Sequence, residues 1–352
     1  MKGTHDKLDK VKDYYGKVLS SNRDLKTDAC CSTEAFPRHI QKILSQIENE
    51  VLDKFYGCGS PIPPAIEGRV VLDLGCGSGR DVFILSKLVG ESGQVIGVDM
   101  TEEQLSVASR HIPSMTERFS FSRPNILLKH GYIEDLAAMD IQDNSVDVVV
   151  SNCVINLSPM KSEVLSEIFR VLKPGGELYF SDIFSDRRIP VEYHDDPVLH
   201  GECLSGAMYI EDFRRLLRDL GCLDYRVTAT SPVNISNTEI ESAIGMVRFY
   251  SMTIRAFKLN NLEDICEDYG QHATYLGTIE GHPHSFDLDD HHRFQTGKPM
   301  LVCGNTASML HETRFTKHFK VVGDRSVHYG PFDCGTAGIA PSESGTGSGS
   351  CC

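Results

Sequence analysis

Short apolar runs and helical apolar patterns alternate along the middle of the chain. Five runs have the length and the β-branched content of buried strands: residues 70–74, 94–99, 126–130, 145–152 and 177–182. Four segments have apolar residues at helical spacing: 80–89, 101–111, 161–172 and 210–220. Thr101 and Gln104 have the spacing of a capping box at the start of the second of these helices. Strands that alternate with helices are typical of a parallel sheet with helices on both faces, so the pattern predicts a doubly wound α/β domain.

The segments on either side of this domain have a different pattern of apolar and polar residues. Two further helices are expected at 5–20 and 39–55, with a polar, cysteine-bearing loop between them. Beyond residue 235 we expect shorter strands, at 273–279, 300–303 and 319–322. We therefore divide the chain into N-terminal helices with a cysteine loop, the doubly wound domain, a smaller α+β C-terminal domain and a flexible tail: residues 1–66, 67–232, 233–334 and 335–352.

Histidines and aspartates gather between residues 282 and 292, among them His291, His292, Asp289 and Asp290. Side chains of this kind can bind a metal ion. A solvated polar loop explains them equally well and is our prediction, because charge runs usually lie on a protein surface.

The chain is acidic and rich in cysteine: its 352 residues include 35 Lys+Arg, 49 Asp+Glu and 12 Cys, for a net charge of -14. A negative charge disfavours nucleic acid and anionic membranes as partners. No apolar run approaches the roughly 18 residues of a membrane span, and the polar start has no secretory signal. We therefore expect a cytoplasmic monomer, in which clustered thiols are more often ligands or redox groups than disulfide staples.

A glycine-rich turn follows the first expected strand. Gly75, Gly77 and Gly79 let the backbone turn tightly and approach a ligand without side-chain clashes. Asp99 ends the next strand, about twenty residues further on, where an acidic group can accept the hydroxyls of a ribose. The fingerprint of NAD-binding proteins has a glycine where this chain has Arg80. The turn therefore indicates a nucleoside-containing cofactor other than NAD.

The same turn, with Asp73 before its first glycine, resembles the first motif of class I S-adenosylmethionine methyltransferases. Three further stretches match the later motifs of that class in order: residues 131–134, 147–152 and 172–176. A sulfonium cofactor has no pyrophosphate to bind at a helix N-terminus, and an acid nearby suits its positive charges. The expected fold is therefore a Rossmann-like class I methyltransferase fold, with S-adenosylmethionine bound in the domain at 67–232.

Four cysteines are far apart in the sequence and have none of the close pairing of structural zinc sites: Cys30, Cys58, Cys153 and Cys203. Cys153 follows the fourth strand at the carboxyl edge of the sheet, where ligands of open α/β sheets bind, and Cys203 can reach the same edge from its loop. Thiolates select soft ions. Trivalent arsenic fits, because it binds three thiolates and keeps a lone pair that can attack a methyl sulfonium in line. No general base is then needed, and the protein supplies mainly proximity and orientation.

The sequence resembles the arsenite S-adenosylmethionine methyltransferases over nearly its whole length. The stretches that carry the resemblance are 25–30, 56–59, 72–81, 130–134, 151–157, 175–182 and 201–204. The run Asn-Cys-Val-Ile-Asn-Leu at 152–157 is especially specific, and residues 277–282 resemble the eukaryotic, algal branch. The resemblance implies arsenic detoxification by methylation of thiol-conjugated arsenite, first to methylarsenite and then to dimethylarsenite.

The resemblance also implies roles for individual residues. Cys153 and Cys203 hold arsenic in every step, and Cys58 is a third ligand that leaves once a methyl group is attached. Cys30 forms a disulfide with Cys58 in the redox step that follows methyl transfer, and glutathione or thioredoxin supplies the reductant. Cys31 doubles Cys30 but matches the family less well. The implied cofactor-binding residues are Tyr56, Asp73, Gly75, Gly77, Ser78, Gly79, Asp99, Met100, Ile133, Glu134 and Asn152.

Two other functions remain open from the residues. A methyltransferase for an organic molecule, with buried structural cysteines, would need a general base, for which His194 and His200 are candidates. A protein that only sequesters arsenic or zinc would have a vestigial nucleotide fold, which the intact Asp73 and Asp99 disfavour. The terminal pair Cys351 and Cys352 is expected in a dispensable mobile tail rather than in an arsenic-scavenging site.

Overall fold

The computed structural model describes residues 36–55, 57, 59, 61–190, 193, 204–235 and 244–333. Several predicted features lie outside these residues: the helix at 5–20, the tail at 335–352, Cys30, Cys31, Tyr56, Cys58, His194, His200 and Cys203.

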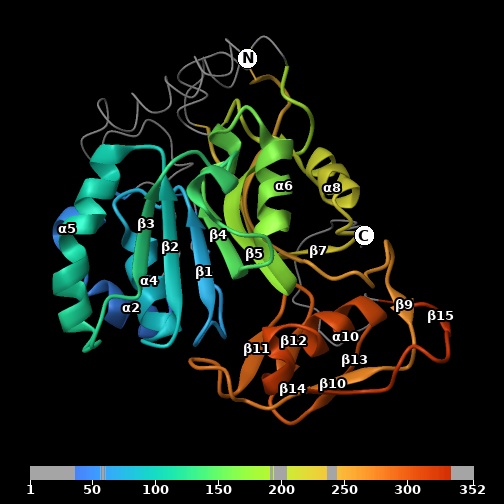
Figure 1. Cartoon of the computed structure of the whole chain (residues 1–352). Helices are drawn as coiled ribbons and strands as arrows, with labels where there is room; N and C mark the ends of the chain where they lie inside the picture. Colours follow the sequence, from blue (N-terminus) through green and yellow to red (C-terminus); the bar gives the residue numbers. More distant parts are fainter. Residues whose placement is uncertain are drawn as a thin grey trace.

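An eight-stranded, mostly parallel sheet forms the centre of the larger domain (Figure 1). Its strands lie in the order β3-β2-β1-β4-β5-β8-β7, and β6 pairs with β5. Their bounds are β1 Val70–Leu74, β2 Gln94–Asp99, β3 Ile126–His130, β4 Val146–Asn152, β5 Leu172–Ser185, β6 Met208–Tyr209, β7 Tyr225–Val233 and β8 Phe249–Phe257. The first five strands are parallel neighbours, which confirms the predicted doubly wound fold.

Helices cover both faces of this sheet (Figure 1). On one face lie α2 Arg38–Leu44, α3 Asn49–Asp53, α4 Arg80–Val89 and α5 Glu102–Arg118. On the other lie α6 Lys161–Val171 and α8 Ile210–Asp219. The central strand β4 is apolar on both sides, since Val148, Val149 and Val150 are all buried, as expected for a sheet enclosed by two helical layers. No helix among the described residues is long and apolar enough to cross a membrane.

The helix predicted at 39–55 is two short helices, α2 and α3, with a turn between them. The hydroxyl of Ser45 donates to the carbonyl of Lys42, 2.9 Å away, and such local bonds compete with helix continuation. Ile47 and Val51 nevertheless pack in one buried cluster with residues of α4 and α5. The apolar spacing in residues 39–55 thus correctly predicts which side chains are buried, but it does not predict the break between the two helices.

An antiparallel strand, β8, extends the sheet beyond the boundary expected at residue 232. β8 pairs antiparallel with both β5 and β7, so the sheet takes in residues up to Phe257. The C-terminal unit that follows is α+β, as predicted, with α10 Gly304–His311 and seven short strands: β9 Glu267–Asp268, β10 His272–Tyr275, β11 Ser285–Asp287, β12 Arg293–Gln295, β13 Pro299–Leu301, β14 Phe319–Val322 and β15 Gly330–Pro331.

Buried ion pairs join the two units, and they correct one prediction. Asp289 and His292 are buried rather than part of a solvated loop, whereas Asp290 and His291 are exposed, as predicted. His292 Nδ1 lies 2.8 Å from Asp289, and Asp289 accepts from Arg226 of β7 at 3.1 Å. A buried aspartate needs a charged partner, and Arg226 provides one from a strand more than sixty residues away.

Candidate functional site

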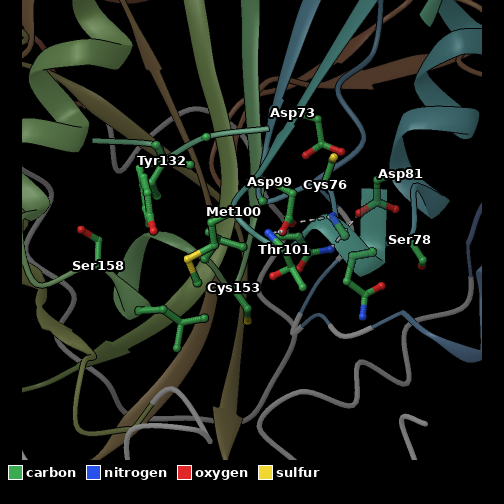
Figure 2. Close-up of a pocket in the computed structure, with 18 of the residues that line it drawn as sticks. Asp73, Cys76, Ser78, Asp81, Asp99, Met100, Thr101, Tyr132, Cys153 and Ser158 are labelled. Carbon is green, nitrogen blue, oxygen red and sulfur yellow. Dashed lines mark hydrogen bonds between the residues drawn. The ribbon is translucent and has the colours of Figure 1, made fainter. Parts of the chain in front are cut away.

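A cavity opens at the carboxyl ends of β1, β2 and β4, the edge at which open α/β sheets bind ligands. Figure 2 shows Asp73, Asp81 and Asp99 on one side of it, with Met100, Cys153 and Tyr132 towards the other. Ten residues predicted to belong to the site line this cavity: Asp73, Gly75, Gly77, Ser78, Asp99, Met100, Ile133, Glu134, Asn152 and Cys153. The fold therefore brings most of the described candidates to one place.

The three glycines of the turn have different structural roles. Gly75 has a φ of 72°, and a Cβ there would collide with the side chain of Val154. Gly77 has a φ of 51° and open space where a Cβ would stand, so its backbone is accessible to a ligand. Gly79 does not line the cavity: it precedes α4 with a φ of 94°, and a Cβ would lie 2.9 Å from Ala108. Its position indicates a role in helix packing.

The Asp99 carboxylate organises the middle of the site. One oxygen accepts from the backbone N–H of Gly77 and the other from that of Thr101, both at 2.8 Å. Burial raises the pKa of Asp99, while these hydrogen bonds lower it. A carboxylate offers about four lone-pair sites, so further hydroxyl donors can bind here.

The capping box predicted at Thr101 is not formed. The Thr101 side chain makes no capping bond to α5, and it hydrogen bonds to Asp99 instead. The charged carboxylate of Asp99, at the end of β2, is a stronger partner for the Thr101 hydroxyl than the backbone of α5.

Unpaired polar atoms surround the acidic side of the cavity. Burial raises the pKa of Asp73 well above its ordinary value, and the charges of Asp81 and Asp99 add to the shift. Among the described residues, no hydrogen-bond partner reaches Asp73 Oδ2, Glu134 Oε2 or Asn152 Oδ1. Buried acceptors without partners are costly, so this arrangement favours a ligand that carries positive charge and hydrogen-bond donors.

Cys153 stands at the turn directly after β4. Its φ of 57° places a non-glycine residue in the left-handed region, a strained conformation that is concentrated at functional sites. The backbone N–H donates to the carbonyl of Ser181 in β5, 2.9 Å away. Cys153 is disulfide-bonded, whereas the other described cysteines, Cys76, Cys222, Cys266 and Cys303, form no disulfide.

The residues on both sides of Cys58 are docked beside Cys153. Asn152 donates from Nδ2 to the carbonyl of Gly59 at 3.1 Å and to Asp81 at the same distance. A Cβ on Gly57 would lie 2.8 Å from the Asn152 side chain, and one on Gly59 would lie 2.5 Å from Ser181. Small residues are therefore required at 57 and 59 for this segment to approach the ends of β4 and β5.

The residue that follows Cys203 belongs to the same apolar cluster as Cys153. Leu204 is fully buried in this cluster, together with Leu157 and Ile183. Cys203 itself lies outside the described residues, but the next residue along the chain is anchored next to the loop of Cys153. The chain around three of the four candidate cysteines thus converges on one edge of the sheet.

Several residues that line the cavity were not predicted: Phe55, Asp81, Thr101, Gln104, Tyr132, Leu157 and Ser158. Tyr132 and Leu157 lie within stretches that carried motif matches and could have been inferred from them. Phe55 had no such signal; the guanidinium of Arg80 stacks 3.1 Å from the centre of its ring.

Asp182 binds the loop after Cys153, and its shifted pKa predicts that stability depends on pH. Burial raises its pKa from an ordinary 3.8 to about 7, while hydrogen bonds from Ile183 and Asn156 and the charge of Lys161 oppose the shift. Between these values the folded protein keeps a proton that the unfolded chain has released. The contribution of Asp182 to the free energy of unfolding is therefore fully present below about pH 4 and is lost as the pH rises through about 7. Between these values the free energy of unfolding falls by at most about 1.4 kcal/mol per pH unit on account of this group.

We expect Asp182→Asn to flatten this part of the stability profile. The free energy of unfolding, measured by urea titration at several pH values, should fall more steeply between about pH 4 and 7 in the unmodified protein than in the variant. Parallel profiles would mean that Asp182 titrates normally.

Comparisons with known proteins agree with this geometry. The model of a methyltransferase domain matches residues 66–221, and that of an arsenite methyltransferase C-terminal domain matches residues 269–336. An arsenite methyltransferase of Aquipseudomonas alcaligenes is 52% identical over 92% of this chain and 94% of its own length. The human arsenite methyltransferase is 41% identical over 88% of this chain and 82% of its own. The crystal structure of an arsenic(III) S-adenosylmethionine methyltransferase from Chlamydomonas reinhardtii superposes with a TM-score of 0.83, at 52% identity, and covers 85% of this chain and all of that one.

Proposed function

Since this chain belongs to the arsenite methyltransferase family, we propose that it methylates trivalent arsenic held by its own cysteine thiolates, with S-adenosylmethionine as methyl donor. The observation that carries the proposal is the position of Cys153. This strained cysteine lines an acidic cavity at the carboxyl edge of the sheet. The chain around Cys58 and Cys203 packs beside it.

The described residues fit S-adenosylmethionine. Asp99 has lone pairs left for the two ribose hydroxyls, and Gly77 exposes its backbone to the cavity. Asp73 and Glu134 have buried oxygens without partners among the described residues, which suits the ammonium group of the cofactor. When bound, S-adenosylmethionine supplies a methyl group on a positively charged sulfur, which the arsenic lone pair can attack.

The first test of this fit is Asp99→Ala. Loss of charge-assisted hydrogen bonds to the ribose should weaken S-adenosylmethionine binding by at least about 10-fold, because even one such bond contributes about 1.5–3 kcal/mol. Isothermal titration calorimetry measures the change. Glu103→Ala serves as the control, because Glu103 is an exposed acid in the first turn of α5 and should leave the affinity unchanged. Equal affinity in the two variants would remove Asp99 from the binding site.

Arsenic binding follows from the chemistry of the thiols. Cys153 and Cys203 hold arsenic in every step, and Cys58 completes the set of ligands for inorganic arsenite. Thiolates are the soft ligands that a thiophilic ion requires. Arsenic has no proton to lose, so the protein needs to orient the lone pair and exclude water rather than provide a base.

Reduction of the thiols is part of the proposed cycle. Cys153 must be released from its disulfide before it can bind arsenic. Transfer of the methyl group to the arsenic lone pair raises arsenic from the trivalent to the pentavalent state, and oxidation of the Cys30 and Cys58 thiols to a disulfide is proposed to supply the two electrons that return it to the trivalent state. Glutathione or thioredoxin would return the cysteines to their reduced state through thiol–disulfide exchange.

Product analysis tests the proposed function. The protein is incubated with arsenite, methyl-labelled S-adenosylmethionine and glutathione, and the arsenic species are separated by chromatography over time. Methylarsenite followed by dimethylarsenite is the expected result. Tight binding of both compounds without product, even with thioredoxin added, would indicate a sequestration protein. Methylation of an organic acceptor instead, insensitive to loss of Cys153, would indicate the second alternative.

A further inference from the structure

The loop after Cys153 touches the segment around Gly206, which follows Cys203 in the sequence. Asn156 follows Cys153 by three residues, and Gly206 follows Cys203 by three. A Cβ on Gly206 would collide with the carbonyl oxygen of Asn156. The backbone N–H of Ala207 donates to the carbonyl of Leu204 at 3.1 Å, which closes a turn around Gly206. The two loops therefore meet backbone to backbone, and only glycine fits at the contact.

Asn156 is in turn fixed on β5. Its backbone N–H donates to Asp182 Oδ2 at 3.1 Å, and its side-chain amide donates to Asp182 Oδ1 at 2.7 Å. The same amide donates to the carbonyl of Ile183 at 2.5 Å. Asn156 and Asp182 are both fully buried, so the surroundings leave little freedom for this contact to shift.

The beginning of the Cys153 loop is bound to the same strand. The backbone N–H of Cys153 donates to the carbonyl of Ser181, the residue before Asp182. Three consecutive residues of β5 thus hold both ends of the loop, while Gly206 places the second loop against it. These contacts act on the backbone that bears the Cys153 thiol, and Asn156, Asp182 and Gly206 do not line the cavity.

From these contacts we propose that Asp182, Asn156 and Gly206 are positioning residues that fix the backbone of the Cys153 loop and thereby set the affinity of the Cys153 thiolate for trivalent arsenic. The inference rests on the proposed function. A thiolate binds arsenic without reorganisation of its loop only if the backbone that bears it is already held in place. A displacement of about 1 Å in such an arrangement can cost about 100-fold in rate or affinity.

Gly206→Ala tests the inference directly, because the added methyl group forces the two loops apart. The variant and the unmodified protein are reduced with a phosphine, and arsenite binding is measured by equilibrium dialysis with detection of arsenic by mass spectrometry. We expect the dissociation constant for arsenite to rise by about 10- to 100-fold. The affinity for S-adenosylmethionine, measured by calorimetry, should be unchanged, because Gly206 does not line the cavity.

Gly93→Ala is the matched control. A Cβ there would lie 2.8 Å from the backbone carbonyls of Arg69 and Val89, so the crowding also involves backbone. Gly93 precedes β2 at the opposite end of the sheet from the cavity. This variant should lose stability without losing affinity for arsenite, which separates a local effect on the thiols from a general loss of packing.

Asn156→Ser provides a second route if Gly206→Ala does not fold. It removes the two side-chain hydrogen bonds but keeps the backbone contact with Gly206, and it should also weaken arsenite binding while S-adenosylmethionine binding persists. Unchanged arsenite affinity in a folded variant, with the unmodified protein binding normally, would overturn the inference. Failure of the unmodified protein to bind arsenite would instead refute the proposed function.

Discussion

Replacement of Cys153 by serine is expected to reduce the methylation of both arsenite and methylarsenite by at least about 100-fold. A serine hydroxyl is a hard, protonated ligand that cannot replace a thiolate on a soft ion. Cys153 is proposed to bind arsenic in both steps, so the methylation rate should fall with both substrates. Initial rates of transfer of labelled methyl groups to each substrate, at saturating cofactor and reductant, measure the effect.

The same loss is expected for Cys203→Ser, and Cys266→Ser is the control. Cys266 lies in the C-terminal unit, forms no disulfide and does not line the cavity. Its replacement should leave both rates close to those of the unmodified protein. Activity on arsenite that survives loss of Cys153 would argue against thiolate-bound arsenic and in favour of another acceptor.

Cys58→Ser is expected to separate the two methylation steps. Inorganic arsenite has three positions for thiolates, whereas methylarsenite has only two, because its methyl group occupies the third. The variant should therefore lose at least about 100-fold in the rate with arsenite and keep most of its rate with methylarsenite. Parallel assays with the two substrates, each started with reduced protein, provide the comparison.

An equal loss with both substrates would contradict the exchange of Cys58 for a methyl group. The affinity for S-adenosylmethionine must be measured on the same preparation, because the neighbouring Gly59 binds Asn152 at the wall of the cavity. A drop in cofactor affinity would show that the substitution has disturbed the docking of this segment rather than removed a ligand.

The strands and helices of the central domain could be predicted because they are enclosed by apolar layers. β1, β2 and β3 have the predicted bounds, and α4 does as well. β7 and β8 were missed because buried arginines interrupt their apolar pattern. Arg255 in β8 is almost fully buried and pairs with Glu177 at 2.6 Å, a partner that lies 78 residues away. A sequence pattern does not reveal such a partner in advance.

The site was predictable as a set of residue types but not as a set of contacts. Asp99 and the glycine turn follow from local spacing, since a strand and a turn fix their positions. The docking of the Cys58 segment depends on a hydrogen bond between Asn152 and Gly59, which are 93 residues apart. The contact between Asn156 and Gly206 is likewise set by tertiary packing. Long-range contacts of this kind determine how the thiols are arranged.

Arsenic K-edge X-ray absorption of the reduced protein with one equivalent of arsenite, without any small thiol and without cofactor, tests the thiolate site most directly. We expect arsenic to have three sulfur neighbours with arsenite, and two sulfur neighbours and one carbon with methylarsenite. Cys153→Ser should lose one sulfur neighbour in both cases. A spectrum dominated by oxygen neighbours, or one that Cys153→Ser leaves unchanged, would contradict arsenic binding by these cysteines.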